Sequence, residues 1–268
     1  MDVVTLIGFA AAVIIGVSLG LIGGGGSILT VPVLVYILDV DPVLATAYSL
    51  FVVGSTSLVG AGTFMKKGLV NYKTAIVFAI PSFIAVFLTR KFLVPWLPDP
   101  LFTLGDTAVT KNVGIMVFFA LIMLAASISM ITGKKCKDCD ENEEIKFNYP
   151  MIALEGSVVG LITGIVGAGG GFLIIPALVL LARLPMKMAV GTSLLIIAAK
   201  SLIGFLGDLS TQTIDWKMLL IFTGLSIVGI FIGSALSKRI NEKILKTGFG
   251  WFVLVMGIYI IAKELLAL

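Results

Sequence analysis

The chain of 268 residues is 59% hydrophobic and only 13% charged, with a mean hydropathy of +1.14. A soluble domain needs about a quarter of its residues charged to cover its surface. Here the apolar residues form runs long enough to cross a bilayer, which takes about 20 residues per helix. The composition therefore excludes a soluble protein. The net charge of +4 does not require nucleic acid as a partner, because Lys and Arg gather in the cytoplasmic loops of membrane proteins.

The apolar runs predict five segments in each half of an all-α, polytopic membrane protein. In chain order they are 3–22, 27–38, 43–65, 72–94 and 112–132, and then 150–166, 171–182, 187–207, 216–236 and 247–266. Segments 27–38 and 171–182 are too short to span about 30 Å comfortably at about 1.5 Å per residue. Each follows a glycine cluster, and glycines interrupt a helix because they permit unusual backbone angles. Each half thus opens with either a re-entrant hairpin or a broken, tilted helix pair, and three spanning helices follow.

The two halves are related in sequence at an offset of 144 residues. Comparing 16–73 with 160–217 gives 16 identities in 58 positions, and the glycines fall into register. We therefore expect a first membrane repeat at 1–132, a cytoplasmic linker at 133–149 and a second membrane repeat at 150–268. An odd number of crossings in each half turns the second half upside down relative to the first. This is the inverted-repeat plan of many secondary transporters.

Basic residues mark alternate connections between the segments. They follow the third, fifth, seventh and ninth segments, so the positive-inside rule places these connections in the cytoplasm and both termini outside. The opposite connections carry aspartates. One loop, 95–111, departs from the pattern, because Arg90, Lys91 and Lys111 flank it on the outer side.

The glycine clusters predict a binding site for an anion. A helix that begins at a glycine break inside a membrane presents unpaired N–H groups and a partial positive charge, and an anion satisfies both. Two such starts, at Ser27 and near Phe172, could converge between the halves. Alternatively, the glycines only allow close helix packing, as Gly16 and Gly160 do. The residues predicted to bind the anion here are Gly23, Gly24, Gly25, Gly26, Ser27, Gly167, Gly169, Gly170 and Gly171.

The third segment of each half adds a polar stripe. Ser49, Thr56 and Gly60 are spaced i, i+7 and i+11 and share one helical face. Their repeat mates are Ser193, Lys200 and Gly204. A charge placed as deep as that of Lys200 is costly and faces a cavity or a partner. Lys200 either attracts the anion at the glycine breaks, which we favour, or snorkels to the outer surface or pairs with Asp208.

Other candidate groups are few. Glu155 either carries a coupling proton or is an interfacial residue at a helix end, which we favour. The chain has no histidine, which excludes histidine ligands, Ser-His nucleophiles and histidine proton relays. Cys136 and Cys139 form a lone CxxC that is either redox-active, half of a zinc site or, as we favour, part of a solvated linker. We predict no metal, no cofactor and no catalytic residue.

The two glycine motifs resemble those of the TauE/SafE family of sulfite exporters. They read Gly20-Leu-Ile-Gly-Gly-Gly-Gly-Ser-Ile-Leu-Thr-Val-Pro32 and Gly164-Ile-Val-Gly-Ala-Gly-Gly-Gly-Phe-Leu-Ile-Ile-Pro176. The following Ala189-Val-Gly-Thr-Ser193 is also similar to the family's pattern, so Thr192 and Ser193 join the predicted binding residues. The resemblance extends over nearly the whole chain, but Lys200 matches no family pattern.

The resemblance implies secondary transport, often outward, of a small sulphur-containing anion such as sulfite or an organosulfonate. The substrate would bind between two inverted repeats in a bacterial or archaeal plasma membrane. The expected partners are the anion and the lipid bilayer, not nucleic acid, and a homo-oligomer is left open. An anion-selective channel lined by the same broken helices is the alternative, and a membrane-embedded enzyme a weaker one, because few buried groups suit acid–base chemistry.

Overall fold

The computed structural model of the chain describes residues 3–104, 107–132, 149–167, 170–171, 174–175, 178, 184–210, 212–236 and 242–266. The described residues are mainly helical, and six of their helical stretches are long and apolar enough to cross a membrane. These stretches are Val4–Leu21, Pro42–Lys66, Tyr72–Trp96, Lys111–Ile128, Lys187–Asp208 and Trp216–Leu236. The prediction of a helical, polytopic membrane protein is confirmed.

The first half follows the predicted order of segments. Its long helices are α1 (Val3–Ile22), α3 (Pro42–Lys66), α4 (Tyr72–Leu88) and α6 (Lys111–Thr132). The short segment is a 3-10 helix, η1 (Gly24–Leu29), that continues into α2 (Thr30–Tyr36). Helix α4 continues through a π-helical turn, η2 (Thr89–Leu93), into the short α5 (Val94–Trp96). A small antiparallel hairpin of β1 (Phe102–Leu104) and β2 (Thr107–Val109), which no sequence pattern predicted, precedes α6.

The second half repeats this order where it is described. Helix α7 (Tyr149–Val166) corresponds to α1, α9 (Met186–Asp208) to α3, α10 (Trp216–Leu236) to α4 and α11 (Glu242–Leu266) to α6. Most of the predicted segment 171–182 lies outside the described residues. The same holds for Cys136 and Cys139 and for the rest of the linker from 133 to 148.

Helix starts in the two halves use equivalent caps. The Asn71 carboxamide oxygen accepts a hydrogen bond of 3.0 Å from the Thr74 N–H at the start of α4. Its repeat mate Asp215 accepts one of 3.1 Å from the Met218 N–H at the start of α10. Such caps satisfy N–H groups that have no partner within the helix. The repeat therefore extends to the signals that begin the helices.

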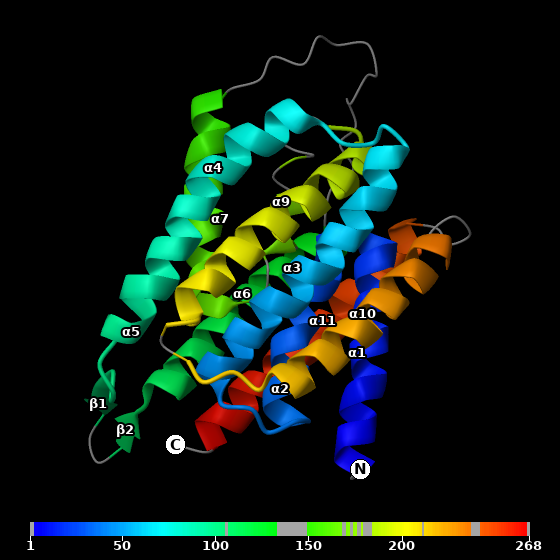
Figure 1. Cartoon of the computed structure of the whole chain (residues 1–268). Coiled ribbons are helices and arrows are strands. Elements are labelled where there is room, and N and C mark those ends of the chain that lie inside the picture. Colours follow the sequence, from blue (N-terminus) through cyan, green and yellow to red (C-terminus); the bar gives the residue numbers. More distant parts are fainter. Residues whose placement is uncertain are drawn as a thin grey trace.

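The helices pair across the two halves (Figure 1). Helix α1 packs most extensively against α10, and its counterpart α7 packs against α4, the counterpart of α10. Helix α3 packs against its own counterpart α9, and α6 against α11. A Cβ added to Gly16 would collide with the carbonyl oxygen of Ser226, and one added to Gly160 would meet that of Ser82. Gly16 and Gly160 are repeat mates, and so are Ser82 and Ser226. The same contact is therefore made twice with the halves exchanged.

Helices α3 and α9 cross in opposite directions. A Cβ on Gly60 would meet Leu194 and Ile230, whereas one on Gly204, its repeat mate, would meet Leu50 and Val86. Rising numbers on α3 thus meet falling numbers on α9. Figure 1 shows the same relation, with α3 and α9 running toward opposite ends of the bundle.

The outer faces of the bundle are apolar. On α4, Ile76, Ile80 and Ile84 are more than half exposed, at 57%, 53% and 57%, and they follow one another at four-residue spacing. Polar side chains, including Thr56, Ser57 and Lys200, are instead fully buried. This arrangement suits a hydrocarbon solvent, which an exposed apolar stripe matches and a charged side chain does not.

The two ends of the bundle differ in charge. Both chain termini, the β1–β2 hairpin and the connection from α9 to α10 lie at one end, and the turn from α3 to α4 lies at the other (Figure 1). Lys66, at the end of α3, and Lys67 in the turn are exposed at one end, whereas Asp39, Asp215 and Lys217 are exposed at the opposite, terminal end. We call the first the basic end and the second, after its aspartates, the acidic end. The assignment of the basic end to the cytoplasm stays a prediction.

Candidate functional site

The helix that follows the first glycine break begins one turn earlier than predicted. Gly23 ends α1 with a φ of 74°, a backbone conformation that side chains other than hydrogen disfavour. The chain then tightens into the 3-10 helix η1 at Gly24, and the α-helical geometry resumes only at Thr30. The predicted helix start at Ser27 was therefore wrong. The Ser27 hydroxyl is buried and donates to the Gly24 carbonyl oxygen at 2.7 Å, inside the 3-10 turn.

The second glycine break uses the same backbone device. Gly167 follows α7 with a φ of 72°, and Gly170 has a φ of 64°. A Cβ on Gly167 would collide with Thr46, and one on Gly23 would lie 2.9 Å from Val190, the repeat mate of Thr46. Gly169 and the predicted helix start at Phe172 lie outside the described residues.

The two breaks meet inside the bundle. A Cβ added to Gly24 would collide with the backbone of Gly171, and one added to Gly171 would collide with Gly24. These are backbone-to-backbone contacts, so neither residue tolerates a side chain without movement of the chain. The described part of the chain therefore brings the two glycine clusters into contact at Gly24 and Gly171.

Lys200 lies against the second break. A Cβ at Gly170 would lie 2.6 Å from the Lys200 Nζ atom. The lysine is 0% exposed, and its ammonium group donates a hydrogen bond of 3.0 Å to the Thr163 hydroxyl on α7. It does not snorkel to a surface, and Asp208 pairs with Arg90 instead. The two alternatives to a central position for Lys200 are both wrong.

The remaining stripe residues divide into two groups. Thr56, the repeat mate of Lys200, and Ser49 are fully buried on α3, and their hydroxyls have no hydrogen-bond partner among the described residues. Thr192 and Ser193 are engaged locally. The Asn71 N–H donates to the Thr192 hydroxyl at 2.9 Å, and the Ser193 hydroxyl donates to the Val190 carbonyl at 2.8 Å. Thr192 precedes Lys200 by eight residues, or about 12 Å of helix, so it lies apart from the ammonium group.

Glu155 is half-buried on α7, eight residues before Thr163. This spacing corresponds to about 12 Å along the helix. The carboxylate therefore does not neighbour the Lys200 ammonium group. Within the described ranges there is also no group of three histidine, cysteine or acidic residues that could hold a metal ion.

Thr163 and Arg90 are two buried residues that we did not predict from the sequence to be part of the interior. Thr163 has Leu19 as its repeat mate, so the repeat did not single it out. Arg90 stood among the charges of loop 95–111, yet the structure places it at 0% exposure with its Nε 3.4 Å from Asp208 Oδ2. Its removal from the loop weakens the one exception to the positive-inside pattern.

The site is thus a buried lysine whose ammonium group donates to the Thr163 hydroxyl and lies beside the glycine break at Gly170. Among the described residues its hydrogen-bond partner is this one neutral hydroxyl, an unfavourable state for a buried ammonium group, because it has lost its water without gaining an opposite charge. An anion that reached the group would supply this opposite charge. Because Lys200 and the hydroxyl of Thr56 are fully buried, the chain must open before any solute can enter.

Comparisons with known proteins agree with this membrane architecture. The model of the family described as Sulfite exporter TauE/SafE matches residues 8–260. A "Probable membrane transporter protein" of Xylella fastidiosa strain 9a5c is 28% identical over 255 residues, covering 94% of this chain and 92% of the relative. The "Probable membrane transporter protein YunE" of Bacillus subtilis strain 168 is 27% identical over 266 residues, covering 88% and 89%. A probable membrane transporter of Methanocaldococcus jannaschii is 26% identical over 254 residues, covering 91% and 87%.

No solved structure matches the chain. The family match nevertheless extends over almost all of the sequence, including both glycine breaks and Lys200. The relatives are named as membrane transporters rather than enzymes. The chain belongs to the TauE/SafE sulfite exporter family and is a multi-pass membrane transporter.

Proposed function

We propose that this transporter exports a small sulphur-containing anion, such as sulfite or an organosulfonate, by alternating access between two inverted repeats. The buried ammonium group of Lys200 is the observation that carries the proposal. It is fully enclosed, its hydrogen-bond partner in the described part of the chain is the neutral Thr163 hydroxyl, and it adjoins the glycine break at Gly170. The substrate class and the outward direction come from the family and from the anion preference of such a centre.

The inverted relation of the halves is supported by the exchanged contacts. Helices α1 and α7 each pack against the fourth segment of the other half, and α3 meets α9 in the opposite direction. With a first repeat at 1–132 and a second at 150–268, rotation of one repeat against the other would open the site first to one side and then to the other. The substrate-binding groups would be the two glycine breaks, Lys200 and the hydroxyl of Thr56.

The contact between Gly24 and Gly171 favours a carrier over a channel. Their backbones touch beside the enclosed lysine, so the structure corresponds to a closed state without a continuous pore through this point. In a carrier the contact would part on one side at a time. A channel would instead hold a continuous path open.

Flux measurements with purified protein in liposomes test the proposal. Sulfite, thiosulfate and a sulfonate should be taken up with saturating kinetics and against a gradient, and sulfate and a neutral solute serve as controls. Lys200→Met should abolish this flux in protein that remains folded. Lys187→Met, the same substitution at an exposed position of α9, should leave the flux intact.

Two outcomes would contradict the proposal. Normal flux through Lys200→Met would remove the role of the lysine, and ohmic single-channel currents would replace the carrier by a channel. Thermal stabilisation provides an independent measure of binding, because a ligand of the folded state raises apparent stability. Glu155→Gln in the same flux assay tests proton coupling, which predicts loss of pH-driven uptake with anion binding retained.

A further inference from the structure

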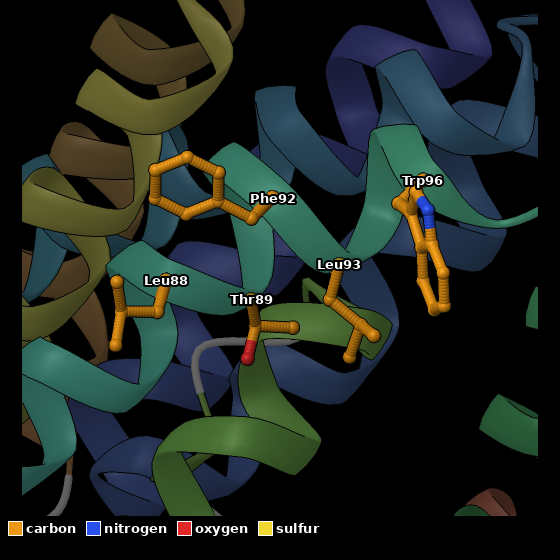
Figure 2. Close-up of a pocket in the computed structure, with 5 residues that line it drawn as sticks. All are labelled: Leu88, Thr89, Phe92, Leu93 and Trp96. Carbon is orange, nitrogen blue, oxygen red and sulfur yellow. The ribbon is translucent and has the colours of Figure 1, made fainter.

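Arg90 is a second buried cation, separate from Lys200. The π-helical turn η2 carries it; Thr89 of this turn is also buried, whereas Lys91 and Phe92 are exposed. Figure 2 shows Leu88, Phe92 and Trp96 around an open cavity of about 280 Å³ on the outside of α4 and α5. These three side chains are 48%, 58% and 81% exposed, whereas Arg90 is 0% exposed and faces the bundle.

Helix α9 closes over the arginine at the acidic end. A Cβ on Gly207 would lie 3.0 Å from the Arg90 Cβ, so the glycine permits a close approach of the two helices. The next residue, Asp208, places its Oδ2 3.4 Å from Arg90 Nε, and both side chains are buried. The ion pair therefore joins α4 of one half to α9 of the other.

The ion pair leaves most of the guanidinium without partners. Arg90 Nε, Nη1 and Nη2 have no hydrogen-bond partner among the described residues. A guanidinium offers five N–H donors in a planar fork, and each buried donor left unpaired is unfavourable because it has lost its hydrogen bonds to water. One carboxylate at 3.4 Å balances the charge of the guanidinium but leaves its N–H groups without hydrogen bonds to the described residues. The arrangement therefore suits a second ligand with several oxygens.

We propose that Arg90 is a second anion-binding station, between Lys200 and the acidic end, and that Asp208 competes with the transported anion for its guanidinium. Lys200 and Asp208 are eight residues apart on α9, or about 12 Å along the helix. An oxyanion that leaves Lys200 toward the acidic end thus meets Arg90 next. Sulfite, sulfonate and thiosulfate groups present oxygens that the guanidinium fork binds in pairs. The inference rests on the proposed anion transport.

Asp208 acts as an internal substitute for the anion. When no substrate is present, the carboxylate neutralises Arg90 and holds α9 against α4. An arriving anion takes its place, so the helices separate and the acidic end opens. The carboxylate also keeps a second substrate from resting there, because two anions cannot share one guanidinium without repulsion. The station is then a gate whose opening requires substrate.

Removal of the competing charge tests the inference. Asp208→Asn should lower the sulfite or methanesulfonate concentration that gives half-maximal thermal stabilisation by about fivefold or more. Asp39→Asn is the matched control, because it removes the same charge at an exposed position of the same end. Asn tolerates the positive φ of 52° at that residue. The control should bind like the unmodified protein.

The double variant Arg90→Met/Asp208→Asn separates a binding role from a structural one. It leaves no buried charge unpaired, so it should fold, lose the gain in affinity of Asp208→Asn and transport anions at least tenfold more slowly. Unchanged affinity in Asp208→Asn, or unmodified flux in the double variant, would make the pair a helix clamp and overturn the inference.

Lys200→Met in the same assays keeps the two proposals distinct. If Lys200→Met abolishes transport while Asp208→Asn changes nothing, only the second station fails. If Lys200→Met transports normally while Asp208→Asn binds more tightly, the Lys200 site fails and the Arg90 station stands. If no anion stabilises any variant, both fail.

Discussion

Lys200 on α9 and Thr163 on α7 are joined by a hydrogen bond of 3.0 Å at a depth where both residues are buried. Thr163→Val keeps the shape of the side chain but removes the acceptor. The ammonium group then has no partner that replaces its lost water, so we expect a loss of about 1–3 kcal/mol in the free energy of unfolding. Thermal or denaturant unfolding of the protein in detergent measures this loss.

The same substitution elsewhere provides the control. Thr223 is also buried, and its hydroxyl donates to the Leu219 carbonyl within α10, away from any charge. Thr223→Val should therefore lower stability by less than Thr163→Val. Combining Thr163→Val with Lys200→Met should recover most of the loss, because the unsatisfied charge is gone. Equal losses for the two threonine variants would contradict a special role of the lysine bond.

The meeting of the two glycine breaks makes a second prediction. Gly24→Ala places a methyl group against the backbone of Gly171, and backbone atoms cannot move aside as a flexible side chain can. We expect overpacking to lower the free energy of unfolding by about 1–3 kcal/mol and to slow transport.

Gly62→Ala on α3 is the matched control, because a Cβ there meets nothing within 4 Å. It should be neutral or stabilising by up to about 1 kcal/mol, since Ala favours a helix interior. Flux and unfolding are measured on both variants. A Gly24→Ala protein as stable and active as Gly62→Ala would show that the contact is not required.

Much of the fold could be predicted because the sequence signals were long and repeated. The runs at 43–65 and 187–207 differ from α3 and α9 by one residue at each end. The cost of burying a charge was enough to place Lys200 at the centre, where the structure has it beside Gly170. In these cases one physical requirement was enough: an apolar run of spanning length for the helices, and the cost of burying a full charge for Lys200.

Other features depended on contacts that no local pattern encodes. Arg90 was grouped with loop charges because a π-helical turn, which rotates it inward, has no distinct sequence signal. Thr192 lies in a stretch that is similar to a family motif, yet its hydroxyl accepts a hydrogen bond from the backbone N–H of Asn71, 121 positions away. The start of the short helix moved from Ser27 to Gly24 because the chain could tighten into a 3-10 turn. The Thr192 bond joins distant segments, and the other two outcomes are local changes of helical geometry that the hydropathy pattern does not encode.

Lys66 and Ser210 are repeat mates at an offset of 144; Lys66 is the last residue of α3, Ser210 lies in the turn after α9, and both are exposed. If the repeats are inverted, these two positions lie on opposite sides of the membrane. In a protein without its native thiols (Cys136→Ser, Cys139→Ser), we introduce Lys66→Cys or Ser210→Cys and label intact cells with an impermeant maleimide. The positive-inside rule places Lys66 in the cytoplasm, so only Ser210→Cys should react before the membrane is permeabilised.

The alternative patterns of labelling each identify a different error. Reaction of Lys66→Cys alone in intact cells would keep the inversion and reverse the orientation, so that the acidic end with Arg90 and Asp208 faces the cytoplasm. Reaction of both or of neither would place the mates on one side, and the halves would then be parallel repeats. That result would overturn the inverted-repeat plan, and access to the Lys200 centre would then have to alternate as it does in transporters built from parallel repeats.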